Sequence, residues 1–220
     1  MPKPRLTFLH TAPANAKSFG ELAEQLASDI DIKHVLAPEY LEEAISAGGV
    51  SLELQQRIAS RLVAEADAGA NIVLLSCSTI GSAADLARTL TSVPIMRIDR
   101  PMAETAVRLG PRILVAACVE STIYPTFELI ESTAGTSGSE VQIKTVLLSG
   151  WEKWQAGDAR GYAEDIAAGL RSLPKEFDVV VLAQASMANA ASLLEDLGVP
   201  VLSSPRLGLE AALSVLRRSL

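Results

Sequence analysis

The stretch "NIVLLSCSTIGSAADL", from Asn71 to Leu86, carries the pattern that decides the fold. Four apolar residues lead to a cysteine, two hydroxyl residues follow, and an alanine-rich segment continues with helical spacing. The stretch "DVVVLAQASMANAASLL", from Asp178 to Leu194, repeats this pattern with a glutamine where the cysteine stood. A short apolar strand that leads directly into a helix is typical of α/β proteins with parallel sheets.

The two stretches belong to a longer internal repeat. A shift of 107 residues superimposes them, and it also places Arg5–Thr11 over Arg112–Cys118. A shift of 106 residues places Val93–Val107 over Val199–Leu213. These matches predict two similar α/β units along one chain, and the alternative is two unrelated halves that share only a strand–helix pattern.

Short apolar strands are expected to alternate with helices over the whole length, and this alternation favours parallel sheets covered on both faces. The expected strands are 6–9, 33–36, 72–75, 94–96, 113–116, 142–147, 179–182 and 200–202. The expected helices are 18–28, 51–68, 81–90, 102–109, 125–132, 159–172, 187–197 and 207–218. We expect residues 1–97 with 206–220 to form the first domain and residues 98–205 the second.

Composition excludes several functional classes. The 220 residues carry a net charge of −7 with scattered Lys and Arg, which argues against a nucleic-acid surface. The apolar runs are too short to span a membrane, and the start has no signal-peptide layout. Cys77 and Cys118 are therefore expected to be reduced thiols in the cytoplasm. His10 and His34 lack the spacing of metal ligands, so no metal site is expected.

The repeat makes a prediction about the site. Ligands of open parallel sheets bind beyond the carboxyl ends of the strands. Two facing units would place Cys77 on one wall of a cleft and Gln184 on the other, each at the start of a helix. Free N–H groups at helix starts favour anions, so the sequence predicts a carboxylate site with a thiol on one side only.

Three segments carry a family resemblance: "LLSCSTIG" around Cys77, "RIDRPMAETAVRLGPRILVAACVESTIYPT" from Arg97 to Thr126, and "LAQASMANA" from Leu182 to Ala190. With them, nearly the whole chain resembles the cofactor-independent aspartate/glutamate racemase superfamily, which includes hydantoin racemases, maleate isomerases and arylmalonate decarboxylases. The resemblance implies two pseudo-symmetric α/β domains with the active site in the cleft between them. It also implies a small carboxylate substrate, no cofactor, and compatibility with a homo-oligomer.

Racemases of this superfamily use two cysteines, of which one removes a proton next to a carboxylate and the other returns one from the opposite face. Cys77 matches the first cysteine, whereas Gln184 stands at the place of the second and cannot titrate. The resemblance therefore implies a racemase-like or isomerase-like enzyme with Cys77 as acid or base. A single-thiol decarboxylase of the arylmalonate type and a non-catalytic binder of small acids are the alternatives.

The remaining candidates surround these two positions. His10 ends the first strand and is expected to adjust the protonation of Cys77 or to share its proton, unless it only bonds a nearby carbonyl. Gln184 is expected to bond a substrate oxygen, or else to fix a loop. Cys118 is interpreted as a small core residue, with a displaced second acid as the alternative. The expected substrate-binding residues are Thr11, Asn15, Ser78, Thr79, Thr122, Ala185 and Ser186.

Overall fold

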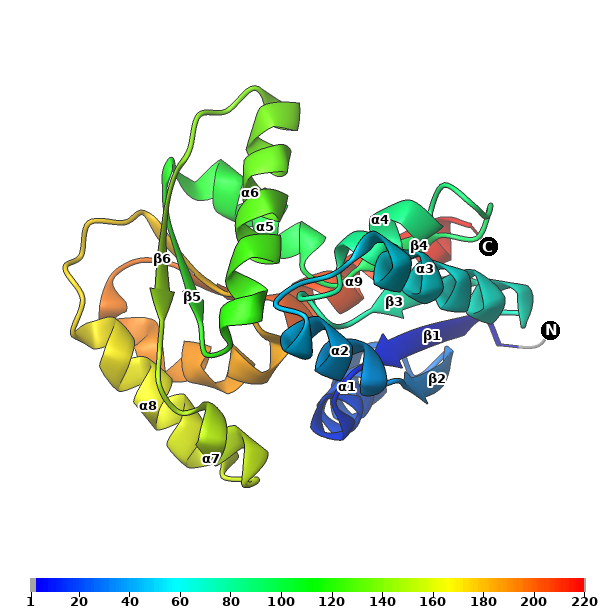
Figure 1. The fold of residues 1–220 in the computed structure, drawn as a ribbon, viewed down its shortest axis with the longest axis horizontal. Helices are drawn as coiled ribbons and strands as arrows, with labels where there is room; N and C mark the ends of the chain where they lie inside the picture. Colours follow the sequence, from blue (N-terminus) through cyan, green and yellow to red (C-terminus); the bar gives the residue numbers. More distant parts are fainter. Residues whose placement is uncertain (1–2, 220) are drawn as a thin grey trace. The chain divides into compact units, whose positions relative to one another are not determined.

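The computed structural model describes residues 3–219, which form two compact units (Figure 1). Unit 1 runs to Asp99 and resumes at Pro205, and unit 2 spans Arg100–Ser204. Each unit contains one four-stranded parallel sheet with helices on both faces. The α/β class expected from the alternating pattern is confirmed.

Unit 1 has the strand order β2-β1-β3-β4. Its strands are β1 (Arg5–His10), β2 (Asp31–Leu36), β3 (Ile72–Leu75) and β4 (Ile95–Arg97). Its helices are α1 (Pro13–Leu26), α2 (Glu39–Ser46), α3 (Leu52–Asp67), α4 (Ser82–Ala87) and α9 (Ser204–Arg218). The C-terminal helix thus returns to the unit in which the chain begins (Figure 1).

Neighbouring residues of β1 face opposite sides of its sheet, as the pleat of a strand requires. Leu9 packs into a cluster with Ile58 and Leu62 of α3, all of them fully buried. Phe8 packs on the other face against Phe19 of α1, with ring centroids 5.1 Å apart. This alternation decides which strand-end side chains can meet in the site described below.

Unit 2 has the strand order β6-β5-β7-β8. Its strands are β5 (Arg112–Ala117), β6 (Gln142–Leu147), β7 (Val179–Leu182) and β8 (Val201–Ser203). Its helices are α5 (Arg100–Leu109), η1 (Glu120–Thr122), α6 (Ile123–Ser137), α7 (Trp151–Gln155), α8 (Ala159–Arg171) and η2 (Ala185–Leu197), where η marks a 3₁₀ helix. One face of its sheet packs against α8 and η2 (Figure 1).

The strand pairings of the two units correspond to one another. Leu6 pairs with Ile72 between β1 and β3, and Ile113 pairs with Val179 between β5 and β7, so both partners shift by 107 residues. The repeat also includes a hydrogen bond between a side-chain oxygen and the backbone N–H of the first residue of β1 and of β5. Asn71 Oδ1 accepts the Arg5 N–H (2.7 Å), and in unit 2 Asp178 Oδ2 accepts the Arg112 N–H (2.9 Å).

The expected secondary structure differs from the structure mainly in short helices. All eight expected strands are present, but α2 and α7 were not expected, and residues 185–197 form a 3₁₀ helix. Helix α7 carries Trp151 and Trp154. Both rings lie against Tyr162 of α8, with centroids 6.3 and 5.5 Å away, so they pack within unit 2.

Candidate active site

Cys77 lies in a loop at the carboxyl end of β3 in unit 1. The segment Ile72–Ile80 is buried throughout, and the Cys77 side chain is 9% exposed. Helix α4 begins only at Ser82 and has six residues. The expectation that Cys77 starts a helix is therefore wrong, because four residues of loop separate Cys77 from α4.

Hydroxyl and backbone groups surround the Cys77 sulfur. Burial raises the pKa of the Cys77 thiol above its ordinary value. Hydrogen bonds from the Thr11 side chain, from the backbone of Ile80 and from the backbone and side chain of Thr79 act in the opposite direction and lower this pKa. The thiol is thus held mainly protonated, in a setting where donors are ready to stabilise a thiolate when one forms.

Ser78 follows Cys77 directly and is 5% exposed. Its Oγ is buried and has no hydrogen-bond partner within residues 3–219. A buried hydroxyl without a partner costs about 1–3 kcal/mol, so a polar ligand atom beside Ser78 would relieve an existing penalty. Thr79 contacts the thiol, and the expected binding residues Thr11, Ser78 and Thr79 therefore gather around Cys77.

Asn15 lies elsewhere in unit 1, on the first turn of α1. Its backbone N–H donates to the Ala12 carbonyl at 3.1 Å, and its side chain is half-buried. A substrate-binding role for Asn15 stays a prediction.

His10 does not serve the thiol in the way that the sequence suggested. Its Nδ1 lies 2.8 Å from Ser76 Oγ, and its Nε2 lies 2.8 Å from His34 Nδ1. Ser76 Oγ donates to the Leu9 carbonyl (3.2 Å), so it accepts the Nδ1–H of His10, and His34 donates to His10. His10 stacks on Phe8, on the face of the sheet opposite to Leu9, and strand alternation explains why its ring does not face Cys77.

The pairing of the two histidines has an electrostatic consequence. Burial, followed by the charge of His34, lowers the pKa of His10 from 6.5 to about 3. Burial also lowers the pKa of His34. The sequence analysis assigned no role to His34, and only the register of β1 and β2, which places His34 beside Phe8, could have revealed the pair.

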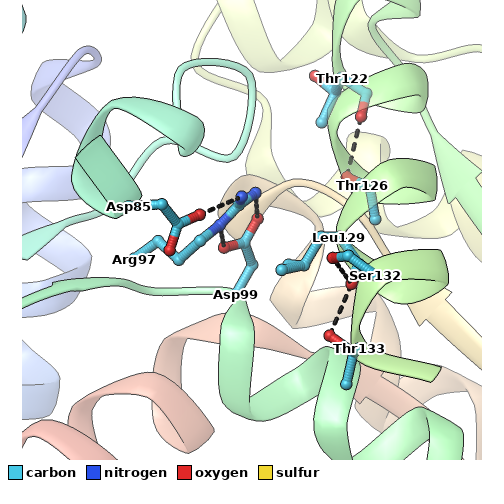
Figure 2. Close-up of polar contacts among 8 residues, drawn as sticks. All are labelled: Asp85, Arg97, Asp99, Thr122, Thr126, Leu129, Ser132 and Thr133. Carbon is cyan, nitrogen blue, oxygen red and sulfur yellow. Dashed lines mark hydrogen bonds and ion pairs between the residues drawn. The ribbon is translucent and has the colours of Figure 1, made fainter. Parts of the chain in front are cut away.

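Arg97 forms a buried ion-pair cluster at the end of β4 (Figure 2). Its Nε and Nη2 donate to the two carboxylate oxygens of Asp99 at 2.7 and 2.9 Å. Its Nη1 donates to Asp85 of α4 at 3.3 Å. Although burial opposes it, the charges of Asp99 and Asp85 raise the pKa of Arg97. The sequence analysis missed this cluster, for which the only signal was the Arg97-Ile98-Asp99 spacing.

In unit 2, Gln184 stands at the position that Cys77 occupies in unit 1. Its Oε1 accepts the backbone N–H groups of Cys118 (2.6 Å) and Val119 (3.0 Å). The side-chain oxygen therefore fixes the loop after β5, which is the alternative that the sequence left open. A bond from Gln184 to a substrate oxygen would need the side-chain NH2 group as its donor, so this contact stays a prediction.

Cys118 belongs to a hydrogen-bonded chain in unit 2. Its thiol donates to the Ser149 carbonyl (3.6 Å), and Tyr162 bonds both the Cys118 thiol and Ser186 Oγ, the latter at 3.2 Å. Burial raises the pKa of Cys118 to about 11, against the hydrogen bond from Tyr162, which lowers it. Ser186 thus bonds Tyr162, a residue that the sequence analysis did not single out.

The two remaining binding candidates also lie in unit 2. Ala185 is half-buried at the start of η2. Thr122 is 2% exposed, and its carbonyl accepts the Thr126 hydroxyl at 2.9 Å (Figure 2). Further along α6, the Ser132 and Thr133 hydroxyls bond the Leu129 carbonyl in the same manner. Substrate contacts of Thr122, Ala185 and Ser186 stay predictions.

The part of the chain that the structure describes contains neither a metal-binding cluster nor a membrane-spanning helix. Within residues 3–219, no group of three or more His, Cys, Asp or Glu side chains could hold a metal ion. None of the helices described there is long and apolar enough to cross a membrane.

The two parallel sheets and the buried thiol beyond the end of β3 define an α/β protein built of two repeated units. The model of the Asp/Glu/hydantoin racemase family matches residues 19–212. The chain belongs to this family, and the superfamily resemblance seen in the sequence is confirmed. No curated protein sequence matches the chain.

Solved structures agree with the family assignment. Allantoin racemase from Klebsiella pneumoniae is 19% identical, with a TM-score of 0.72 over 99% of this chain and 89% of that one. Glutamate racemase from Thermus thermophilus, in complex with beta-chloro-D-alanine, is 18% identical, with a TM-score of 0.70 over 99% and 82%. A liganded arylmalonate decarboxylase variant is 16% identical, with a TM-score of 0.59 over 97% and 92%. These likenesses show the fold.

Proposed function

We propose that this chain is a cofactor-independent enzyme of racemase or isomerase type that moves a proton on the carbon next to a carboxylate. Its substrate class is an amino acid, a hydantoin or a related small acid, and Cys77 is the acid/base. Thr11, Ser78 and Thr79 bind the substrate or the thiolate beside it. Both cysteines are free, which fits the reducing cytoplasm that we propose as its location.

One observation carries this proposal: a buried thiol and an unpartnered buried hydroxyl are adjacent in one loop. Several donors surround the Cys77 sulfur, and Ser78 Oγ offers a hydrogen bond that no described residue uses. A core cysteine needs neither feature, because it is held by apolar packing alone. A bound carboxylate would accept from Ser78 and would place its neighbouring carbon near a proton carrier.

The proposed chemistry is a proton transfer at carbon. The Cys77 thiolate takes the proton, so that an S–H bond forms, the C–H bond breaks, and the electron pair passes into the carboxylate as an enediolate. Return of a proton to carbon completes the exchange. Hydrogen bonds that strengthen as the enediolate gains charge would lower the barrier, and Ser78 is the candidate donor.

A second function, one-thiol decarboxylation, is favoured by two specific observations. Gln184 provides no titratable group at the second-thiol position, and burial raises the pKa of Cys77, which keeps it protonated. In this reaction the carbon–carboxylate bond breaks, carbon dioxide leaves, and the Cys77 S–H proton is delivered to the resulting carbanion. A thiol that rests in the protonated form suits this delivery.

The test is proton exchange in heavy water across a panel of aspartate, glutamate, hydantoins, maleate and substituted malonates. Proton NMR and chiral chromatography on the same samples distinguish the reactions. Deuterium uptake with inversion supports racemisation, and a deuterated product of one hand with loss of carbon dioxide supports the decarboxylase. Cys77→Ala on the identified substrate should lower the rate about 10²–10⁴-fold. Full turnover by Cys77→Ala would contradict both proposals.

A further inference from the structure

Arg97 and Asp99 are buried ions in unit 1, and such a pair needs an explanation. Arg97 is 5% exposed and Asp99 is fully buried. Removing two charges from water costs several kcal/mol per ion, so a buried pair is often no better for stability than apolar packing. Stability alone therefore does not account for a buried guanidinium at this position.

The guanidinium packs directly on Gly81, at the end of the loop that carries Cys77. A Cβ at Gly81 would lie 2.6 Å from Nη2, 2.7 Å from Cζ and 2.8 Å from Nε of Arg97. The backbone of Gly81 is right-handed helical (φ −58°, ψ −33°), a conformation that any residue adopts. Glycine is therefore required here by the close approach of Arg97 and not by the backbone.

Arg97 and Ile98 also hold the beginning of the loop that carries Cys77, at Leu75. Arg97 pairs with Leu75 in the register of β3 and β4, and the Ile98 N–H donates to the Leu75 carbonyl at 2.9 Å. The loop of residues 76–81 thus begins after Leu75, which is bonded to Ile98. It ends at Gly81, which the Arg97 guanidinium covers. Asp85, one turn into α4, is tied to the same guanidinium (Figure 2).

We propose that Arg97, oriented by Asp99, is a positioning residue for Cys77: it fixes the end of the 76–81 loop and thereby the donors that face the sulfur. This inference rests on the proposed role of Cys77. The bidentate bond to Asp99 sets the plane of the guanidinium, and its flat face determines where Gly81 can lie. The backbone of Thr79 and Ile80, which bonds the sulfur, lies in the segment that is held.

The test follows the titration of Cys77 in a Cys118→Ser background, in which Cys77 is the single cysteine. Thiolate ultraviolet absorbance is recorded against pH for Arg97→Lys, Asp99→Asn and Gly81→Ala, and circular dichroism verifies that each variant is folded. Each variant should raise the midpoint by about one pH unit, which corresponds to tenfold less thiolate at a given pH, because donors to the sulfur are displaced.

Gly81→Ala is the decisive variant, since it keeps all three charged groups and disturbs only their contact with the loop. Gly135→Ala is its matched control, because a Cβ at this α6 glycine meets nothing within 4 Å. Arg112→Lys is the control for charge, because Arg112 pairs with Asp178 at the opposite end of its strand in unit 2. Both controls should leave the midpoint unchanged.

An unchanged midpoint in folded Gly81→Ala would overturn the inference, even if Arg97→Lys or Asp99→Asn failed to fold. Equal shifts in the controls would overturn it as well. The titration requires no substrate, so its result is independent of the proposed reaction. If Cys77→Ala kept full proton exchange while Gly81→Ala shifted the midpoint, the proposed function would fail and the positioning of the thiol would stand.

Discussion

Units 1 and 2 both contain one cysteine at the end of a central strand, but the two cysteines occupy different strands. In unit 1, Thr11 follows β1 and Cys77 follows β3, and their side chains are hydrogen-bonded. In unit 2, Cys118 follows β5 and Gln184 follows β7, and the Gln184 side chain bonds the Cys118 backbone. The repeat retains a contact between the two strand ends, while the thiol has changed strands.

This difference shows that a cysteine at the end of a central strand has different surroundings in the two units. The surroundings of Cys77 are hydroxyls and backbone donors that favour a thiolate, together with the unpartnered Ser78. Cys118 instead donates to a carbonyl and accepts from a buried phenol, so its hydrogen bonds are satisfied inside unit 2. We therefore expect the two thiols to differ in function, and four predictions test the difference.

The largest effect is expected on the rate of proton exchange when each cysteine is replaced in turn. Cys77→Ala should lower proton exchange on the identified substrate about 10²–10⁴-fold, because a positioned acid/base is lost. Cys118→Ala should lower it less than tenfold, because Cys118 acts in packing. Exchange monitored by NMR in heavy water gives both values. A larger loss in Cys118→Ala than in Cys77→Ala would reverse the assignment of the two units.

The second effect is the histidine contribution to the pH dependence of stability, which belongs to unit 1 because both histidines lie there. The pKa of His10 is about 3 in the folded chain and 6.5 when unperturbed, so the unfolded chain binds more protons between these values. Stability should therefore fall as the pH decreases from 6.5 towards 3, with a slope of about 1.4 kcal/mol per unit.

Urea unfolding of the wild type and of His10→Asn at several pH values measures this slope. The difference between the two proteins cancels the contribution of the carboxylates, and His10→Asn should show the weaker dependence. Parallel curves for the two proteins would show that His10 is not the group that titrates.

The third effect concerns Gln184 as a structural residue. Gln184→Ala removes the acceptor of two backbone N–H groups, those of Cys118 and Val119, and should destabilise unit 2 by about 1–3 kcal/mol. Gln184→Glu keeps an acceptor at the same distance and should recover most of this loss. Chemical denaturation gives the free energies of unfolding. Full stability in Gln184→Ala would contradict the structural role and favour a substrate contact for Gln184 instead.

The smallest effect is expected at Tyr162. Tyr162→Phe removes the hydroxyl that bonds Cys118 and Ser186 and should cost about 1 kcal/mol in stability. Since this hydrogen bond lowers the pKa of Cys118, its loss should raise that pKa further above 11. In a Cys77→Ser background, slower alkylation of Cys118 checks the direction. Faster alkylation would mean that the ring mainly shields the thiol.

The strand pattern predicted the fold well, because buried parallel strands have a clear apolar signature. The register confirms the two shifts on which the repeat was inferred: Val73 and Val180 differ by 107, while their partners Ile95 and Val201 differ by 106. Helix α2 has only eight residues and helix α7 only five, and both were missed because so few residues show no periodic pattern.

The candidate site was predicted less completely. The cluster of Thr11, Ser78 and Thr79 around Cys77 followed from the rule that side chains gather at the carboxyl ends of parallel strands. The direction of the His10 side chain did not follow, because a place at the end of a strand does not say which face of the sheet the side chain takes. Arg97 was missed because charged residues are seldom buried, and sequence alone does not distinguish a surface ion pair from a buried one.

The return of α9 to unit 1 has a consequence for biosynthesis. Leu209, Ala212, Leu213 and Leu216 are all at most 3% exposed, so the last helix completes the apolar interior of the first unit. Unit 2 is contiguous from Arg100 to Ser204, and it can close on the ribosome before unit 1 receives its final helix. A nascent chain that stops near residue 204 would thus present one finished half and one half with an exposed, aggregation-prone face.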